Sequence, residues 1–364
     1  MAATGDYSIP SESLPKLKYP LQNTLPCAKI TSMTWGVFGH DWAADMLKEH
    51  IIRGTIRHAY LFSGPQGVGR RTLAIRLAQA LNCECPPEPG EVCRICNTCL
   101  QIEKMRHPDL SIVQADQVGG VLKVDQVREL QRSLALHPYS ARYRVALMLR
   151  FQEANINAMN ALLKTLEEPA PQVVLILTAE TPESLIPTIV SRCEVLRLRP
   201  LGVEQVVNGL TNMAEISLHQ ANILAHLSGG RIGVAYQLYN EPSRLQQRED
   251  WIENLTELLS ANRSQRFNFA SDLSKDKESF RCAVTVWLSF FRDILLRSTG
   301  ASAPLINLDK EEEINRISRL LEQQDIVAAT GVLQRILGIL EGPIAINPRL
   351  AAEVLMLDLP HLSA

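Results

Sequence analysis

The sequence predicts an α/β domain with a parallel sheet, followed by two all-helical regions. Apolar runs typical of buried strands alternate with helical segments in the first half: HAYLFSG, DLSIVQA, YRVALML and QVVLILTA. Strands and helices in alternation form right-handed crossovers, which give a parallel sheet with helices on both faces. From about residue 201 no strand-like apolar run recurs, so the rest of the chain is expected to be helical.

The helices between these strands follow from apolar spacing and from proline. The segment from Trp42 to Ile52 carries Met46, Leu47 and Ile51 on one face, as in an amphipathic helix. Further segments that predict helices are RRTLAIRLAQAL, VDQVRELQRSLALH and INAMNALLKTLEEP. The last of them ends at Pro169 because proline cannot continue a helix.

The second half divides into short helices and longer ones. The short helices are VEQVVNGLTNM, SLHQANILAHLSGG and IGVAYQLYN, and the longer ones include CAVTVWLSFFRDILLRS and DIVAATGVLQRILGILEG. Pro242 and the polar SRLQQRED mark a boundary between the two groups. We expect a mobile, Ser/Pro-rich extension over 1–33, the α/β core over 34–200, a small helical domain over 201–241 and a larger one over 242–364.

Composition narrows the functional class. The 364 residues are 46% hydrophobic and 21% charged, with a formal net charge of −2, as in an ordinary globular protein. Whole-chain attraction to nucleic acid or acidic lipid is therefore not implied. There is no run of 18 apolar residues and no apolar signal core at the N-terminus. We expect a cytoplasmic protein without membrane contact.

The stretch GPQGVGRRT, residues 64–72, has the glycine spacing of a phosphate-binding loop. Such loops read G-x-x-x-x-G-K-[ST] and lie between a strand and a helix, and that context is predicted here. Arg70 stands where the lysine belongs, and Arg71 stands where the magnesium-binding hydroxyl belongs. The candidate nucleotide pocket contains Gly64, Gly67, Gly69, Arg70, Arg71 and Thr72.

A hydrolytic site also needs an acidic residue at the end of the next core strand, to hold metal and orient water. The strand YRVALML ends in Arg150 and Phe151, and Glu153 lies too far along the chain. Arginine offers no ligand oxygen to Mg²⁺. We therefore expect no intrinsic ATP hydrolysis, and binding of ATP without hydrolysis is doubtful.

Five of the eight cysteines lie within residues 83–99. In a cytoplasmic chain, such clustering favours metal over disulfides. The spacing C-x9-C-x2-C-x2-C matches a four-thiolate zinc site, and Cys85 competes with Cys83 for the first position. The predicted ligands of this structural zinc are Cys83, Cys93, Cys96 and Cys99.

The order of these motifs resembles that of bacterial clamp-loader subunits of DNA polymerase III, which belong to the AAA+ family. The resemblance covers roughly residues 35–240 and rests on HAYLFSGPQGVGRRTLAIRLAQALNC, the cysteines, HPDL, NALLKTLEEP, LILTAETPESLIPTIVSRC and SGGRIGVA. The C-terminal NPRLAAEVLMLDLP is also similar to the end of such subunits. The resemblance implies an AAA+ core with a zinc insertion, a helical lid, and a helical collar that mediates oligomerisation.

Within this family the sequence is more similar to the delta-prime type than to the gamma/tau motor, which keeps GK[ST] and an acidic strand end. The resemblance implies a non-hydrolysing stator that works with gamma/tau and delta subunits, and through the complex with the sliding clamp and primer–template DNA. It assigns Arg192 as an arginine finger for a neighbouring subunit's ATP. Arg231 matches the second sensor position, although a packing or salt-bridge role is also open for it. Thr178 matches the first sensor position, but packing at the strand end is the favoured interpretation.

Two other functions compete with the stator. One is an active gamma/tau-like ATPase, and the other is a zinc-bearing nucleic-acid adaptor outside any loader. A direct DNA contact would come from basic side chains on and after the helix at 125–137, namely Arg128, Arg132, Arg142 and Arg144. The alternative is that these side chains only form a solvated helix face.

Overall fold

The computed structural model describes residues 35–117, 119–341 and 347–362. The extension expected over residues 1–33 lies outside these ranges, as does Cys27. Within them, no helix is both long and apolar enough to cross a membrane.

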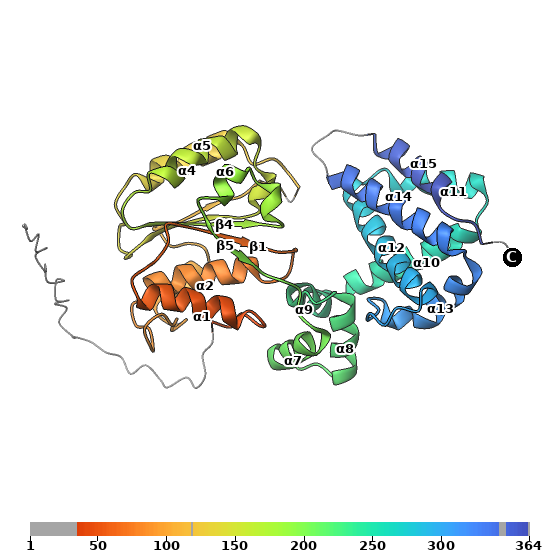
Figure 1. Cartoon of the computed structure of the whole chain (residues 1–364), viewed down its shortest axis with the longest axis horizontal. Helices are drawn as coiled ribbons and strands as arrows, with labels where there is room; N and C mark the ends of the chain where they lie inside the picture. The colour runs from red at the N-terminus through yellow and green to blue at the C-terminus, as the bar shows by residue number, and fades with distance from the viewer. Residues whose placement is uncertain (1–34, 118, 342–346, 363–364) are drawn as a thin grey trace, which may run out of the picture. The chain divides into compact units, whose positions relative to one another are not determined.

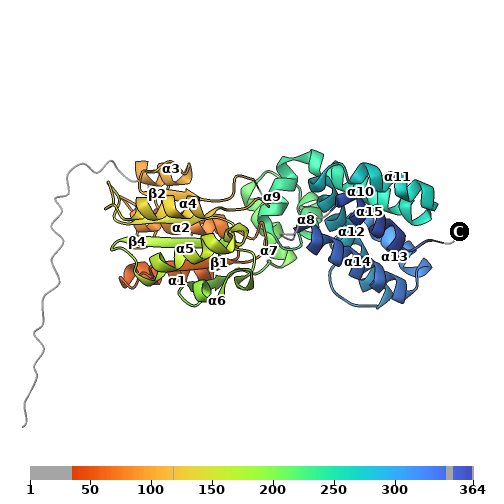
Figure 2. The ribbon, with the colours of Figure 1, turned by 90° about the horizontal axis from the view of Figure 1, so that it is seen from above.

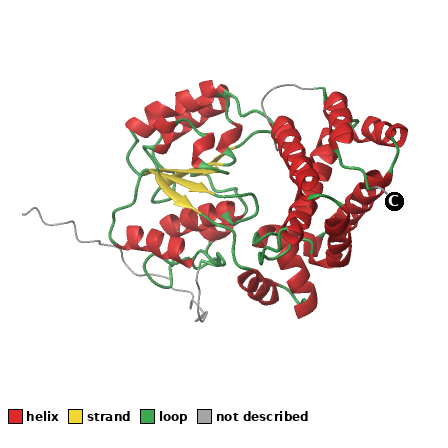
Figure 3. Cartoon of the chain, turned by 45° about the vertical axis from the view of Figure 1, so that its right-hand side comes forward, coloured by secondary structure: helices red, strands yellow, loops and turns green. Residues whose placement is uncertain are grey.

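Parallel strands form the sheet of the α/β core in the order β2-β3-β4-β1-β5. All residues of β1, β3 and β4 are buried, because helices cover both faces of the sheet and leave neither face to water. The strands are β1 Ala59–Ser63, β2 Leu110–Val113, β3 Arg144–Met148, β4 Val173–Ala179 and β5 Glu194–Arg197. Helical elements follow the last strand (Figure 3), which confirms the expected fold class.

The strand pattern of the sequence does not predict β5. This strand lies at the sheet edge beside β1, and only Leu196 of its four residues is buried. Glu194 and Arg197 at its ends are charged. A short edge strand with polar ends lacks the continuous apolar run that marks the central strands.

Helices pack on both faces of the sheet (Figure 1). Tyr60 and Phe62 of β1 join a buried cluster with α1 and α2, whereas Leu61 joins a separate cluster with α4, α5 and α6. The alternation of side chains along a strand thus divides the core into two layers. The helices are α1 Asp41–Ile52, α2 Arg70–Asn82, α4 Val124–Leu134, α5 Ile156–Glu167 and α6 Pro187–Val190.

The helix expected to extend to His137 ends at Leu134. Pro138 follows His137 directly, and a residue before proline is disfavoured in the helical region. The Arg144 side chain donates hydrogen bonds to the carbonyl oxygens of Leu136 and His137. The chain therefore leaves the helix before the proline.

A small helical group follows the sheet. It consists of α7 Val203–Met213, α8 Leu218–Leu227 and α9 Ile232–Asn240. Their apolar faces share a buried cluster that includes Val206, Leu210, Ala221 and Ala225.

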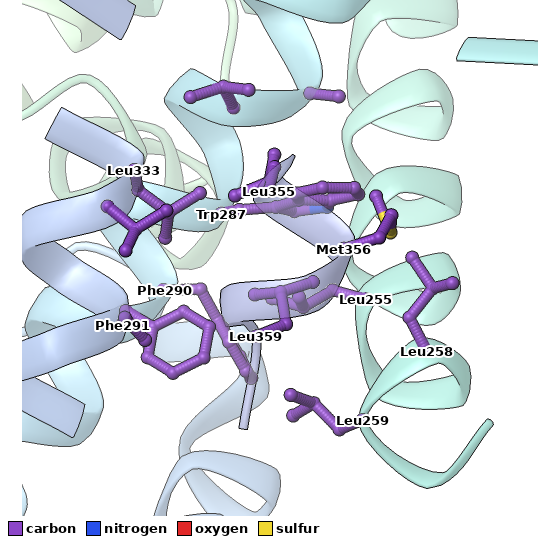
Figure 4. Packing of buried hydrophobic residues seen from close by; sticks show 14 of the residues in the cluster. Leu255, Leu258, Leu259, Trp287, Phe290, Phe291, Leu333, Leu355, Met356 and Leu359 are labelled. Carbon is purple, nitrogen blue, oxygen red and sulfur yellow. The ribbon is translucent and has the colours of Figure 1, made fainter. Parts of the chain in front are cut away.

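The last helices, α10 to α15, share one large apolar cluster. Trp287, Phe290 and Phe291 of α12 are fully buried at its centre (Figure 4). α12 packs against α10, α13 and α14 (Figure 2). The bounds are α10 Pro242–Ser260, α11 Arg263–Leu273, α12 Lys277–Ser298, α13 Glu311–Leu320, α14 Gln323–Glu341 and α15 Pro348–Asp358. The domain boundaries expected near residues 200 and 241 stay predictions.

Buried polar side chains link these last helices. Arg266 donates hydrogen bonds to the carbonyls of Leu258, at the end of α10, and Leu359, after α15. Asp293 is completely buried and accepts from the backbone and side-chain amides of Asn307. Buried polar groups of this kind are tolerated because they are fully hydrogen-bonded.

Candidate functional site

The glycine loop joins β1 to α2, as the sequence predicts. Gly64 and Gly67 have φ values of 149° and 83°. A Cβ atom at Gly64 would lie 2.3 Å from the Leu198 carbonyl oxygen, and one at Gly67 would lie 2.6 Å from a Val234 methyl carbon. Both positions therefore require glycine for space as well as for backbone conformation.

Arg70 and Arg71 lie in different environments. Arg70 is the first residue of α2 and is 8% exposed, and its Nη1 has no hydrogen-bond partner in the part of the chain that the structure describes. Burial lowers the pKa of Arg70, and the nearby Glu180 carboxylate opposes this effect. The exposed Arg71 instead donates to Met105 Sδ at 3.1 Å. Thr72 is exposed.

Arg150 lies at the end of β3, where a hydrolytic site needs an acidic residue. Arg150 follows β3 with φ 51°, and its Nε lies 2.9 and 3.0 Å from the carboxylate oxygens of Glu153. Its backbone N–H donates to Thr178 Oγ1 at 2.9 Å. The Thr178 hydroxyl thus ties the ends of β3 and β4 together.

The start of α9 closes over the glycine loop. The Gly233 N–H donates to the Gly67 carbonyl oxygen at 2.9 Å. Arg231, which precedes α9, donates from Nε to the Ser228 carbonyl at 2.7 Å. Burial lowers the pKa of Arg231, and Glu180 again opposes the shift. Arg70 and Arg231 therefore both lie near Glu180, and Arg150, which is paired with Glu153, lies near Arg70. Three arginines with two carboxylates leave an excess of positive charge, which favours anions over a metal cation.

Arg192 lies in the other layer of the core. It follows α6, whose Ile189 packs in the cluster with α4 and α5. Its Nη2 donates to Glu167 at 2.7 Å and its Nη1 to the Thr188 carbonyl at 2.9 Å. The side chain remains 35% exposed. This guanidinium is therefore held at the surface, on the face of the sheet opposite α2.

The cysteine segment brings four sulfur atoms together. The Sγ atoms of Cys83, Cys93, Cys96 and Cys99 all lie within 4.8 Å of one another. Cys83 directly follows α2, and Cys96 caps α3 (Asn97–Glu103) by accepting the Cys99 N–H. The alternative first ligand, Cys85, is not in this group. The structure thus favours Cys83, as the sequence predicts.

The geometry of the four thiols fits zinc. Tetrahedral zinc with Zn–S bonds of about 2.3 Å requires sulfurs about 3.8 Å apart, and Cys93 and Cys99 are 3.9 Å apart. Backbone N–H groups of Cys96 and Cys99 donate to Cys93 Sγ and Cys96 Sγ at 3.3 and 3.4 Å, which favours thiolates. A hydrogen bond from the Cys99 thiol lowers the pKa of Cys83, and the same contact raises the pKa of Cys99.

A buried polar network fixes this module to α2, and the sequence analysis did not identify it. Arg76 donates to the Trp35 carbonyl at 2.9 Å and forms an ion pair with Glu103 of α3. Gln79 donates to the Cys99 carbonyl at 2.8 Å and to Glu103 at 2.9 Å. The signal in the sequence is the i, i+3 spacing of Arg76 and Gln79 within an otherwise apolar helix.

The basic side chains on and after α4, which were considered for a DNA contact, are not all exposed. Arg144 is 9% exposed and bonds to Ser133 and to the backbone after α4. The DNA contact considered for Arg144 is therefore wrong, because this residue anchors the loop after the helix. Arg128 is exposed beside Asp125, which lies 3.4 Å away.

Comparison with known proteins relates both ends of the described chain to DNA polymerase III subunits. Residues 39–202 match the family described as DNA polymerase III, delta subunit, and residues 242–361 match DNA polymerase III, delta subunit, C terminal. DNA polymerase III subunit delta' of Bacillus subtilis (strain 168) is 29% identical over 316 residues, which cover 85% of this chain and 92% of the relative.

Other relatives match over shorter stretches. Subunit delta' of Pseudomonas aeruginosa is 35% identical over 207 residues, or 56% of this chain and 61% of the relative. Subunit tau of Escherichia coli (strain K12) is 36% identical over 177 residues, or 49% of this chain and 27% of the relative. The chain belongs to the clamp-loader subunits of DNA polymerase III.

Proposed function

We propose that the chain is a delta-prime-type stator of the DNA polymerase III clamp loader, a non-hydrolysing subunit that helps to load the sliding clamp on DNA during replication. The observation that carries this proposal is the pair of arginines at the positions where hydrolysis needs metal ligands. Arg71 replaces the hydroxyl, and Arg150 replaces the acid at the strand end. The nearest carboxylate after that strand, Glu153, is already bound to Arg150.

The gamma/tau-type motor is the second candidate, because the chain is also similar to tau subunits. A motor needs Mg²⁺ between the phosphates and protein oxygens. Around this loop, Arg70 and Arg231 instead place positive charge close to Glu180, and Arg150 lies near Arg70. This charge distribution favours the stator. The third candidate, an adaptor outside any loader, gains no observation in its favour.

ATP turnover by the purified chain separates stator from motor. We expect no hydrolysis above background, with or without DNA. The double variant Arg70→Lys, Arg71→Thr is expected to stay inactive because the acidic strand end is still absent. Turnover near about 1 s⁻¹ by the wild-type chain, an ordinary enzyme rate, would overturn the proposal.

Arg192 is proposed as the arginine finger that completes a neighbouring subunit's ATP site. Its exposed guanidinium is held by Glu167 and Thr188, and a phosphate could replace this single carboxylate partner. A planar guanidinium can bridge the charge that develops on phosphate oxygens. An arginine finger supplied by another subunit accelerates hydrolysis by about 10³–10⁵.

The four clustered cysteines are proposed as ligands of a structural zinc ion. Cys83, Cys93, Cys96 and Cys99 would fill all four coordination positions, which leaves none for substrate or water. The metal would then stabilise the fold of this module and take no part in catalysis. ATP is not proposed as a cofactor, although the glycine loop keeps its phosphate-binding backbone.

Assembly with gamma/tau and delta subunits is proposed to occur through the last helices, the collar. The exposed apolar residues Leu350, Val354 and Leu357 follow one another at i, i+4 and i+7 on α15, so they form a stripe on one face of the helix. The sliding clamp and primer–template DNA would be reached through the complex. A protein with these partners would act in the cytoplasm.

A further inference from the structure

An additional thiol lies against the cysteine cluster. Cys85 Sγ donates a hydrogen bond to Cys93 Sγ, and the two sulfurs are 3.6 Å apart. Cys85 is exposed, whereas Cys93 is only 2% exposed. Pro86 and Pro87 follow directly and restrict the backbone beside Cys85. An accessible thiol is thus held next to a buried sulfur that the proposed zinc site requires.

We propose that Cys85 is an oxidation site, and that its oxidation links it to Cys93 in a disulfide that removes one ligand from the zinc site. The release of metal rests on the zinc ligands proposed above, whereas the disulfide does not. A disulfide requires sulfurs about 2.05 Å apart, so Cys85 and Cys93 need to approach by about 1.5 Å. The exposed residues around Cys85, at 84–85 and 87–89, can supply this small movement.

The reaction needs a two-electron oxidant such as hydrogen peroxide. Peroxide transfers one oxygen to Cys85 Sγ: an S–O bond forms, the O–O bond breaks, and one water leaves with the thiol proton. The Cys93 thiolate then attacks the Cys85 sulfur. The S–S bond forms, the S–O bond breaks, and hydroxide leaves and takes a proton from solvent. The two sulfurs together lose two electrons to the peroxide.

The loss of Cys93 as a ligand would affect the module more than the sheet. Cys93 Sγ also accepts the Cys96 N–H, so the turn around the exposed Arg94 depends on it. α3 keeps its own attachment to α2 through Gln79 and Glu103. Oxidation should therefore release metal and open the turn at Arg94, while the sheet stays folded.

The test uses the zinc-loaded full chain and hydrogen peroxide at millimolar concentration. Zinc release is followed with a colorimetric chelator, and disulfides are mapped by mass spectrometry of non-reduced peptides. We expect a Cys85–Cys93 cross-link, release of about one zinc per chain, and faster tryptic cleavage at Arg94. Dithiothreitol with zinc should reverse all three. In Cys85→Ser, zinc release should slow at least about fivefold.

Cys282→Ser is the matched control, because Cys282 is a partly exposed cysteine outside the cluster, and this variant should behave like wild type. Equal zinc release from Cys85→Ser and wild type, or a cross-link between other cysteines, would overturn the proposal. If the wild-type chain cannot be loaded with zinc but still forms the Cys85–Cys93 cross-link, the zinc assignment is refuted and the oxidation site is retained.

Discussion

At the level of single residues, Arg150 shows how one substitution changes the chemistry of a strand end. An acid at this point could bind metal, but Arg150 turns into the left-handed region at φ 51° and pairs with Glu153. This conformation costs a non-glycine residue about 1 kcal/mol or more. The Glu153 ion pair and the bond to Thr178 offset that cost. The end of β3 therefore has a structural role instead of a role in metal binding.

The Arg192 finger predicts a defect that appears only in the assembled loader. Arg192→Ala should leave the chain folded and assembled, because the ion pair with Glu167 is exposed and such pairs contribute at most about 1 kcal/mol. ATP hydrolysis at the facing subunit should fall by more than about 100-fold, and clamp loading should fall more than total ATPase. Arg192→Lys should not restore either activity.

ATPase and clamp-loading rates of the reconstituted complex check this prediction. Arg197→Ala is the matched control, since Arg197 is a nearby exposed arginine paired with Glu183 at 2.9 Å, and it should keep both rates. Unchanged loading with Arg192→Ala would refute the finger and leave a scaffold role.

Asp109 carries a stability prediction with a defined pH dependence. The backbone N–H groups of Tyr139, Ser140 and Ala141 donate to its carboxylate at 2.6, 2.9 and 2.9 Å. Burial alone would raise the pKa of Asp109, but these hydrogen bonds hold it below its ordinary value. Asp109→Asn should lower the free energy of unfolding by about 1–3 kcal/mol at pH 7.

The sign of the pH effect follows from linkage. Because the folded pKa of Asp109 is depressed, its contribution is complete above the ordinary pKa near 3.8 and is lost as pH falls through the folded value. The difference between wild type and Asp109→Asn should therefore shrink at acid pH. Urea unfolding at pH 7 and below pH 4 measures it, with the exposed Asp116→Asn as control. An equal effect of both variants would contradict the anchoring role.

At the level of elements, the proposed zinc ion and the attachment to α2 would together hold the cysteine module in place. The segment between α2 and α3 has little apolar core of its own beyond the cysteines, as its separate sulfur cluster shows. Arg76 and Gln79 link α3 to the rest of the core. Metal should therefore order the turn between Cys83 and Cys99, while α3 and the sheet are held by protein contacts.

Removing one proposed zinc ligand tests whether metal orders the turn while protein contacts hold the sheet. Cys96→Ser should release zinc and loosen residues 83–99, because structural zinc contributes about 10 kcal/mol to the folding of such modules. The parallel sheet should survive. Metal analysis and hydrogen exchange measure the two effects, and Cys282→Ser should keep about one zinc per chain. A fully ordered module in metal-free wild type would refute the assignment.

At the level of the whole molecule, the helical C-terminal region has a large apolar core of its own. Trp287, Phe290 and Phe291 bury the centre, and Arg266 and Asp293 satisfy the helix ends within it. A rigid helical body of this kind can present an outer face to a partner. The stripe on α15 is the exposed apolar face that we assign to this role.

The α15 stripe predicts a defect in assembly without a defect in folding. The triple variant Leu350→Ser, Val354→Ser, Leu357→Ser should keep its melting temperature within a few degrees, since these side chains are exposed. It should fail to co-elute with the other loader subunits in size-exclusion chromatography. Leu218→Ser, which removes an exposed leucine on α8, should still co-elute. Normal assembly of the triple variant would exclude this face.

The sequence by itself determined the class of the fold and the chemical content of the candidate sites. Continuous apolar runs predicted β1 to β4, since strands buried on both faces need such residues. The glycine spacing located the loop, and the residue types at Arg71 and Arg150 excluded metal ligands there. The cysteine spacing located the sulfur cluster, because short C-x-x-C turns bring thiols together whatever the rest of the fold does.

Only the tertiary structure decided which side chains meet across long separations. It grouped the sulfur of Cys83, and not that of Cys85, with those of the other three cysteines, buried Arg144, added the edge strand β5, and paired Arg192 with Glu167. Asp109, Arg266 and Asp293 became anchors of loops and helix ends in the same way. Local patterns encode periodicity and turn chemistry. In contrast, Asp109 and Ser140 lie 31 residues apart, Arg266 and Leu359 lie 93 apart, and Asp293 and Asn307 lie 14 apart, and such pairs meet only when the layers pack.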